Sequence, residues 1–174
     1  MARRTTAVFS LAAVVLVSVV ISVAGDRYFI ESTCKLTNNP YCVPALATDP
    51  RSYQATTVRD LADVALSVAA AAVTYGSAVT NTLHQRYEGS EPLGRLLLGC
   101  KLMYDRAAVD VVAAAAAFRS GDYRGATRQQ MAAHYAGVMC DELVRNYKEL
   151  MVFDVDKKTI WRSDVAVDLI QLLK

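Results

Sequence analysis

Four cysteines constrain the fold of this chain more than any other feature. Cys34 and Cys42 enclose only seven residues, so a bond between them closes a local turn. In a secreted chain an even number of cysteines suggests disulfides, and four cysteines allow three pairings. The short first loop favours Cys34–Cys42, which leaves Cys100 and Cys140 to pair. Closing that longer loop stabilises a fold by about 4 kcal/mol in the chain-entropy model.

Zinc binding is the alternative use for these cysteines. Structural zinc sites draw on closely spaced cysteine and histidine ligands. This chain has no Cys-x-x-Cys pair, and its only histidines are His84 and His134. We therefore expect disulfides, with no metal and no cofactor.

The N-terminus has the layout of a secretory signal peptide. Two arginines precede a nearly unbroken apolar run over residues 7–24, and Ser22 and Ala24 are small residues at cleavage-site positions. A membrane anchor is the alternative, because the run reaches the lower limit of the roughly 17–25 residues that span a bilayer. Polar residues follow at once, which favours cleavage. The sequence predicts a signal peptide over residues 1–24, and a mature protein with no membrane attachment.

Residues 26–174 are enough for one domain of ordinary size. Without the two arginines of the signal, acidic and basic residues are equal in number. A nucleic-acid-binding surface would be strongly basic, so no nucleic-acid partner is expected.

Three of the four prolines lie within residues 26–54, where they exclude a long helix and predict a short helical hairpin.

The remaining part, residues 56–174, repeats apolar residues at three- and four-residue steps, which is typical of amphipathic helices. The first helix runs from about Thr56 to Tyr87. We expect Ser90 to cap the second, which ends at Ser120-Gly121.

Asp122 is expected to cap a third helix, and a final, shorter helix follows the polar stretch 154–158. Four helices with short connections predict an all-α, antiparallel up-down four-helix bundle. Cys100 lies about two turns into the second helix and Cys140 about five turns into the third, which runs the opposite way. The two cysteines therefore fall at similar heights, which supports their pairing.

Several groups of residues occur together along the chain. They are Cys34-Lys35-Leu36-Thr37 with Pro40-Tyr41-Cys42, Leu96 to Cys100 with Tyr104 and Ala107-Ala108, Gly121-Asp122-Tyr123 with Ala126, and Ala132-Ala133 with Cys140-Asp141-Glu142. This combination resembles the plant invertase and pectin methylesterase inhibitor family over essentially all of residues 26–174. The segment 45–61 is most similar to the branch with invertase inhibitors and related pollen allergens.

The resemblance implies a four-helix bundle behind a stapled helical hairpin, with the same two disulfides. It also implies a secreted inhibitor that binds a cell-wall or vacuolar carbohydrate enzyme in a 1:1 complex and covers its active-site cleft. We expect pectin methylesterase as the target, with acid invertase as the alternative. The apoplast is the expected location in preference to the vacuole.

Two departures from the family pattern leave the target open. Invertase inhibitors often carry Pro-Lys-Phe early in the third helix, where this chain has Tyr123-Arg124-Gly125. Many family members carry an Ala-Leu-Thr-like stretch whose threonine is implied to contact pectin methylesterase. His134-Tyr135 stands there instead.

The sequence contains no constellation for catalysis, with neither a His-Glu-x-x-His motif nor a glycine-rich phosphate loop, so we expect a binding protein and no catalytic residue. A non-inhibitory secreted bundle that binds a small apolar ligand or has a structural role is the second alternative. For an inhibitor, the candidate contacts with the enzyme are outward positions, off the apolar stripe, in the part of the second and third helices through which the resemblance implies contact: Met103, Arg106, Asp110, Gln130 and Tyr135.

Overall fold

The computed structural model describes residues 27–174, so the predicted signal peptide over residues 1–24 lies outside the described part. A helix covers residues 27–37. The elements that follow are α2 (Cys42–Leu46), a 3-10 helix η1 (Pro50–Gln54), α3 (Val58–Tyr87), α4 (Leu93–Arg119), α5 (Tyr123–Leu143) and α6 (Val152–Gln171). Residues 27–174 contain no strand.

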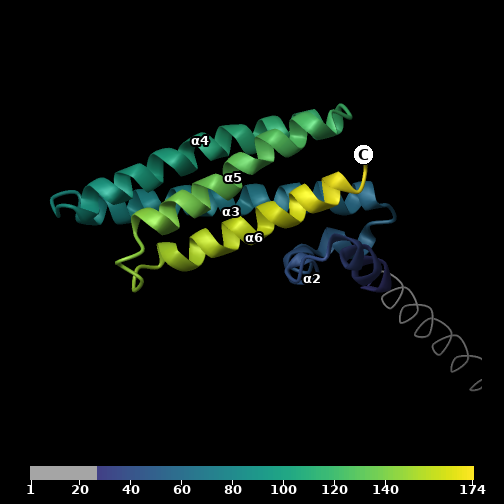
Figure 1. The fold of residues 1–174 in the computed structure, drawn as a ribbon, viewed down its shortest axis with the longest axis horizontal. Helices are drawn as coiled ribbons and strands as arrows, with labels where there is room; N and C mark the ends of the chain where they lie inside the picture. Colours follow the sequence, from purple (N-terminus) through teal and green to yellow (C-terminus); the bar gives the residue numbers. More distant parts are fainter. Residues whose placement is uncertain (1–26) are drawn as a thin grey trace, which may run out of the picture.

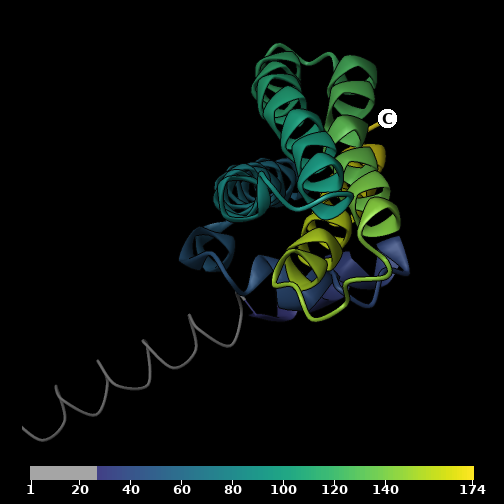
Figure 2. The ribbon, with the colours of Figure 1, turned by 90° about the vertical axis from the view of Figure 1, so that its left-hand side faces the viewer.

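The four long helices form the predicted bundle (Figure 1). Each packs against two neighbours: α3 against α4 and α6, and α5 against the same two helices. Figure 2 shows this arrangement nearly end-on, with the N-terminal hairpin below α6. The predicted fold class is therefore confirmed.

Helix α3 is long and apolar enough to cross a membrane by length and composition alone. In this structure its apolar residues form the bundle core, because α3 supplies a continuous buried stripe from Leu61 to Leu83. Thr57 caps its N-terminus, where the Thr57 side chain accepts from the backbone of Asp60 while the Asp60 carboxylate accepts from the backbone of Thr57. Such a capping box satisfies amides that the first helical turn leaves unpaired.

Two predicted helix starts are wrong. Ser90 does not cap α4: Pro92 takes that position without a side-chain bond, and the Ser90 carbonyl accepts from the backbone of Gly94 instead. The final helix begins before the polar stretch rather than after it. Val155 and Asp156 face the core while Lys157 and Lys158 face solvent, so this stretch is one amphipathic turn of α6.

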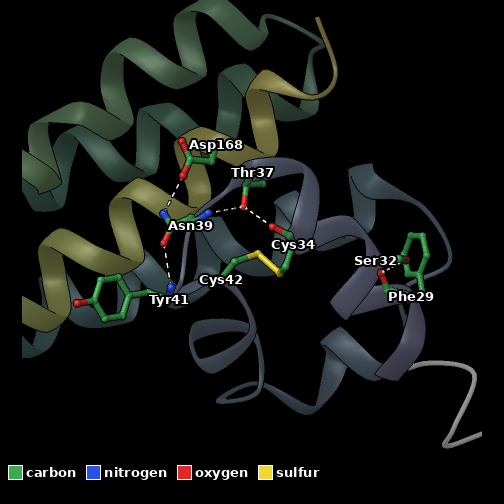
Figure 3. Close-up of a disulfide and its surroundings, with 8 residues drawn as sticks. All are labelled: Phe29, Ser32, Cys34, Thr37, Asn39, Tyr41, Cys42 and Asp168. Carbon is green, nitrogen blue, oxygen red and sulfur yellow. Dashed lines mark hydrogen bonds between the residues drawn. A yellow bond between two sulfur atoms is a disulfide. The ribbon is translucent and has the colours of Figure 1, made fainter.

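The predicted hairpin staple is present, and it joins the helix over residues 27–37 to α2 (Figure 3). The Cα atoms of Cys34 and Cys42 are 5.5 Å apart. In the turn between them, the side-chain amide of Asn39 donates to the Asp168 carboxylate of α6 at 2.7 Å, and Oδ1 of Asn39 accepts from the backbone N–H of Tyr41. The hairpin is thereby attached to the bundle.

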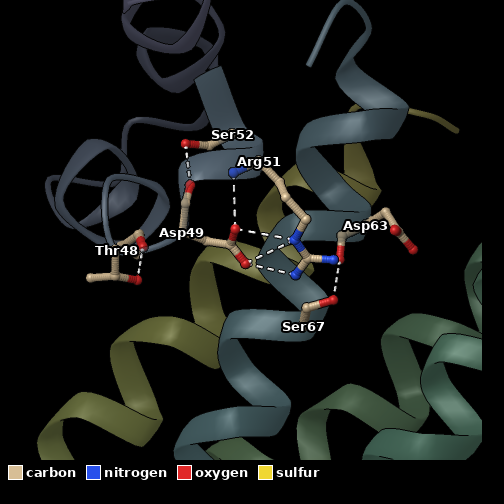
Figure 4. A network of polar contacts seen from close by, with 7 residues as sticks. Thr48, Asp49, Arg51, Ser52, Asp63 and Ser67 are labelled. Atoms are coloured by element: carbon tan, nitrogen blue, oxygen red, sulfur yellow. Dashed lines mark hydrogen bonds and ion pairs between the residues drawn. The ribbon is translucent and has the colours of Figure 1, made fainter. Parts of the chain in front are cut away.

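The exit from the hairpin is held by one ion pair (Figure 4). Asp49 caps η1 by accepting from the backbone of Arg51, and the two side chains pair at 2.6 Å. The hydrogen-bonded Arg51 guanidinium holds the pKa of the Asp49 carboxyl below its ordinary value. The pair lies beside Asp63 and Ser67 on α3, where the chain enters the bundle.

Gly76, in the middle of α3, has a packing role. A Cβ added there would lie 2.2 Å from Cε1 of Tyr104, which α4 contributes and which is fully buried. The missing side chain therefore makes room for the Tyr104 ring. Gly89, in the loop after α3, has nothing within 4 Å of an added Cβ.

We predict that Gly76→Ala lowers the free energy of unfolding by about 1–3 kcal/mol, because it forces overpacking against Tyr104. Gly89→Ala is the matched control and should change stability by less than about 1 kcal/mol. Urea denaturation of the two variants measures both effects. Equal stabilities of the two variants would contradict the packing role of Gly76.

Candidate partner-binding groove

The outward face of α4 is apolar, which is unusual because a bundle helix normally turns polar residues to water. Leu102, Val109 and Val112 are 58%, 63% and 68% exposed. The neighbouring helix α5 adds further exposed apolar side chains: Tyr135, Val138 and Met139. Exposed apolar residues gathered in this way mark interaction sites more often than scattered ones do.

Between these two helices lies a groove of about 520 Å³. Small residues on both helices leave the space: Gly99, Ala107, Ala132 and Ala136. Larger side chains border it: Leu102, Met103, Arg106, Tyr135 and Met139. The groove is thus almost entirely apolar, with one guanidinium at its edge.

The predicted disulfide Cys100–Cys140 is present and joins α4 to α5 beside this groove. Its Cα atoms are only 4.8 Å apart, and both cysteines are fully buried. Gly99 and Met139, the residues next to the two cysteines, line the groove. The disulfide therefore fixes the separation of the two helices where the groove lies.

A buried polar cluster lies on the core side of α4. The Tyr104 hydroxyl donates to Oδ1 of Asp156 at 2.7 Å and lies 3.3 Å from the Thr159 hydroxyl, both on α6. All three side chains are fully buried. Because buried polar groups are costly unless they are paired, these bonds fix the position of α4 relative to α6.

Burial changes the ionisation of this cluster. Desolvation raises the pKa of Asp156 from its ordinary value of 3.8 to about 8, and the negative charge of Asp141 adds to the effect. Burial and the adjacent Asp156 also raise the pKa of Tyr104. In acidic surroundings Asp156 is therefore neutral.

Three of the five predicted contact residues line the groove: Met103, Arg106 and Tyr135. Asp110 is largely covered, lies outside the groove, and accepts from Nε of Arg106 at 3.2 Å. The expectation that Gln130 faces outward is wrong. Gln130 is fully buried on the core side of α5 and its amide donates to the Ser163 hydroxyl at 3.4 Å.

Sequence reasoning missed most of the apolar border, above all Leu102 and Met139. A second apolar stripe on the helix over residues 93–119 was the signal that could have revealed it. Leu98, Leu102, Val109 and Val112 recur at steps of four, seven and three, on the side opposite to the core stripe.

His134 and Tyr135, the pair that departs from the family pattern, have different environments. Nδ1 of His134 lies 2.7 Å from the Asp164 carboxylate of α6, so this histidine bridges two helices. Tyr135 is 58% exposed at the groove. Within residues 27–174, no cluster of three side chains has the arrangement of a metal site.

The family model described as plant invertase/pectin methylesterase inhibitor matches residues 28–162. The chain belongs to this family. The match includes the hairpin, α3, α4, α5 and the first half of α6. The comparison with curated proteins gives no match.

Membership in the plant invertase/pectin methylesterase inhibitor family supports an inhibitor of one of these two enzymes and leaves open which one. The family consists of inhibitors and not of enzymes. Its members are generally secreted to the apoplast, and the two disulfides of this chain are consistent with that location.

The raised pKa of Asp156 predicts that this group stabilises the fold fully below about pH 4 and progressively less as the pH rises toward 8. Between about pH 4 and 8 the folded protein keeps a proton on Asp156 that the unfolded chain releases. The free energy of unfolding therefore falls as pH rises, by up to about 1.4 kcal/mol per pH unit from this group.

Asp156→Asn should remove that part of the slope, because the amide oxygen still accepts from Tyr104 and does not ionise. Asp154→Asn, a change at an exposed position of the same helix, is the control. Urea denaturation at pH 4.5, 6 and 7.5 measures the slopes. An unchanged slope in Asp156→Asn would show that another group causes the pH dependence.

Proposed function

We propose that this protein is a secreted inhibitor that blocks a plant cell-wall pectin methylesterase in a 1:1 complex. The groove between α4 and α5, with its apolar border, is the observation that carries the proposal. Large exposed apolar side chains of this kind are the usual anchors of protein interfaces. Family membership supplies the class of partner.

The groove is rigid before a partner arrives. The Cys100–Cys140 disulfide joins its two walls, and the buried bond from Tyr104 to Asp156 ties one wall to α6. A preorganised surface loses little conformational freedom on binding, so more of the contact energy becomes affinity.

Two exposed arginines extend the groove surface toward the N-terminus of α5. Arg128 lies two helical turns before Tyr135 on the same face of α5, and Arg124 lies one turn earlier still. Both are exposed, and neither forms an ion pair within residues 27–174. A partner with acidic groups around its cleft would therefore dock faster and in a defined orientation.

Pectin methylesterase is favoured over acid invertase by the start of α5. The Asp122 cap accepts from the backbone of Gly125 at 2.8 Å, and an added Cβ at Gly125 would lie 2.1 Å from the Asp122 carboxylate. A larger residue at this position, such as the phenylalanine that invertase inhibitors often carry in this segment, would displace the Asp122 carboxylate from its cap. Acid invertase is nevertheless the alternative target, given the similarity of segment 45–61 to the branch that contains invertase inhibitors.

Secretion rests on the N-terminal pattern over residues 1–24 together with two disulfides, which persist in oxidising compartments. A cell-wall location brings the protein to an extracellular enzyme. The wall is also acidic, which suits a domain with a buried, protonated Asp156.

We predict that Tyr135→Ala weakens inhibition by about tenfold or more, because an aromatic anchor at an interface contributes at least about 1–2 kcal/mol. Tyr75→Ala is the matched control. Tyr75 is 55% exposed on α3, against 58% for Tyr135, so the two variants lose similar surface from different faces. The inhibition constants of both variants are measured. An equal loss of affinity in the two variants would rule out this groove as the binding site for the enzyme.

The target is identified by incubating the purified protein with pectin methylesterase or with acid invertase between pH 4.5 and 7. We expect residual activity of pectin methylesterase to fall to a plateau at one inhibitor per enzyme. Loss of invertase activity alone would establish the alternative target. If neither activity falls, the protein is not an inhibitor of either enzyme, and a bundle that binds a small apolar ligand becomes the better description.

A further inference from the structure

A second site lies on the opposite side of the bundle from the α4–α5 groove, where the hairpin meets α6. The ring of Tyr41 stacks on that of Trp161, with centroids 4.0 Å apart and planes inclined by 5°. Figure 3 shows Tyr41 at the end of the stapled turn, directed toward α6. Both rings line a cavity of about 160 Å³, together with Pro44 and Thr48.

Two cations complete this cavity. Lys158 and Arg162 are one turn apart on α6, and both line it. Neither forms an ion pair in the described part of the chain. Lys157, their neighbour, is turned away and lies over the ring of Phe153.

The exposed or partly exposed carboxylates of α6 either bond to other residues or lie too far from Lys158 and Arg162 to pair with them. Asp164 contacts His134, and Asp168 accepts from Asn39. Asp154, one turn before Lys158, is within ion-pair distance of neither cation. The two positive charges at the cavity therefore lack a negative counterpart within residues 27–174.

We propose that this cavity binds an acidic sugar unit of a polysaccharide, with its ring against the Tyr41–Trp161 pair and its carboxylate between Lys158 and Arg162. The cavity is smaller than the roughly 300–1,000 Å³ of a drug-sized pocket, so it holds one ring rather than an extended chain. Aromatic rings pack well against the C–H faces of sugars. Lysine and arginine select for a negative group, and arginine can bind a carboxylate through two parallel bonds.

This inference goes beyond the proposed inhibition, because the cavity shares no residue with the α4–α5 groove. A protein with both sites would be held on an acidic wall polysaccharide while α4 and α5 remain free to bind an enzyme. The tethering would raise its local concentration where it acts.

Trp161 is the only tryptophan of the chain, so its fluorescence reports on this site directly. The probe is trigalacturonate, and its fully methyl-esterified form is the neutral counterpart. We expect a saturable change in emission with trigalacturonate and none with the ester. Calorimetric titration with the same two compounds detects binding that leaves the emission unchanged.

The variant Lys158→Gln/Arg162→Gln should weaken trigalacturonate binding by about tenfold or more, since charged hydrogen bonds are the strong ones. Lys148→Gln/Lys157→Gln removes the same charge from exposed positions outside the cavity and should bind normally. The proposal is overturned if neither method detects trigalacturonate binding, or if the two double variants bind equally. It is also overturned if triglutamate binds as tightly, because the site would then recognise acidic peptides.

Discussion

The disulfide between Cys100 and Cys140 is the constraint on which the rest of the site depends. It joins α4 to α5 at one height, where the Cα atoms of the two cysteines are 4.8 Å apart. The small residues around it leave a groove that the larger apolar side chains border. A helix pair joined only by packing could close such a groove by sliding together. The covalent bond removes that freedom, so exposed apolar side chains remain available to a partner.

The buried cluster around Tyr104 fixes the position of α4 relative to α3 and α6. Gly76 of α3 makes room for the Tyr104 ring, and Asp156 of α6 accepts a hydrogen bond from the Tyr104 hydroxyl. Burial favours the neutral form of Asp156, which is the form present in acid. An acidic cell wall, where this protein is proposed to act, therefore keeps Asp156 in the form that its buried position favours.

Much of the fold could be predicted from the sequence because it depends on local patterns. Apolar periodicity fixed the long helices, and the height of Cys140 relative to Cys100 indicated their pairing. The start of α6 was missed because Asp154 to Lys158 looks polar until its three-dimensional neighbours show that Asp156 is buried. The prediction for Gln130 is wrong for the same reason: a polar residue on the core face of α5 is recognised only when Ser163 is seen beside it. The apolar groove required two helices to be placed side by side, which no single stretch of sequence describes.

The central claim is that the outer surface of α4 and α5 binds the target enzyme. Photo-crosslinking tests it most directly, with a benzoylphenylalanine placed at Leu102 in one protein and at Tyr75 of α3 in another. Both positions are more than half exposed, so either probe can reach a partner. We expect a covalent adduct with the inhibited enzyme from position 102 and none from position 75. Equal adducts from both positions, or full inhibition with an adduct from position 75 alone, would contradict it.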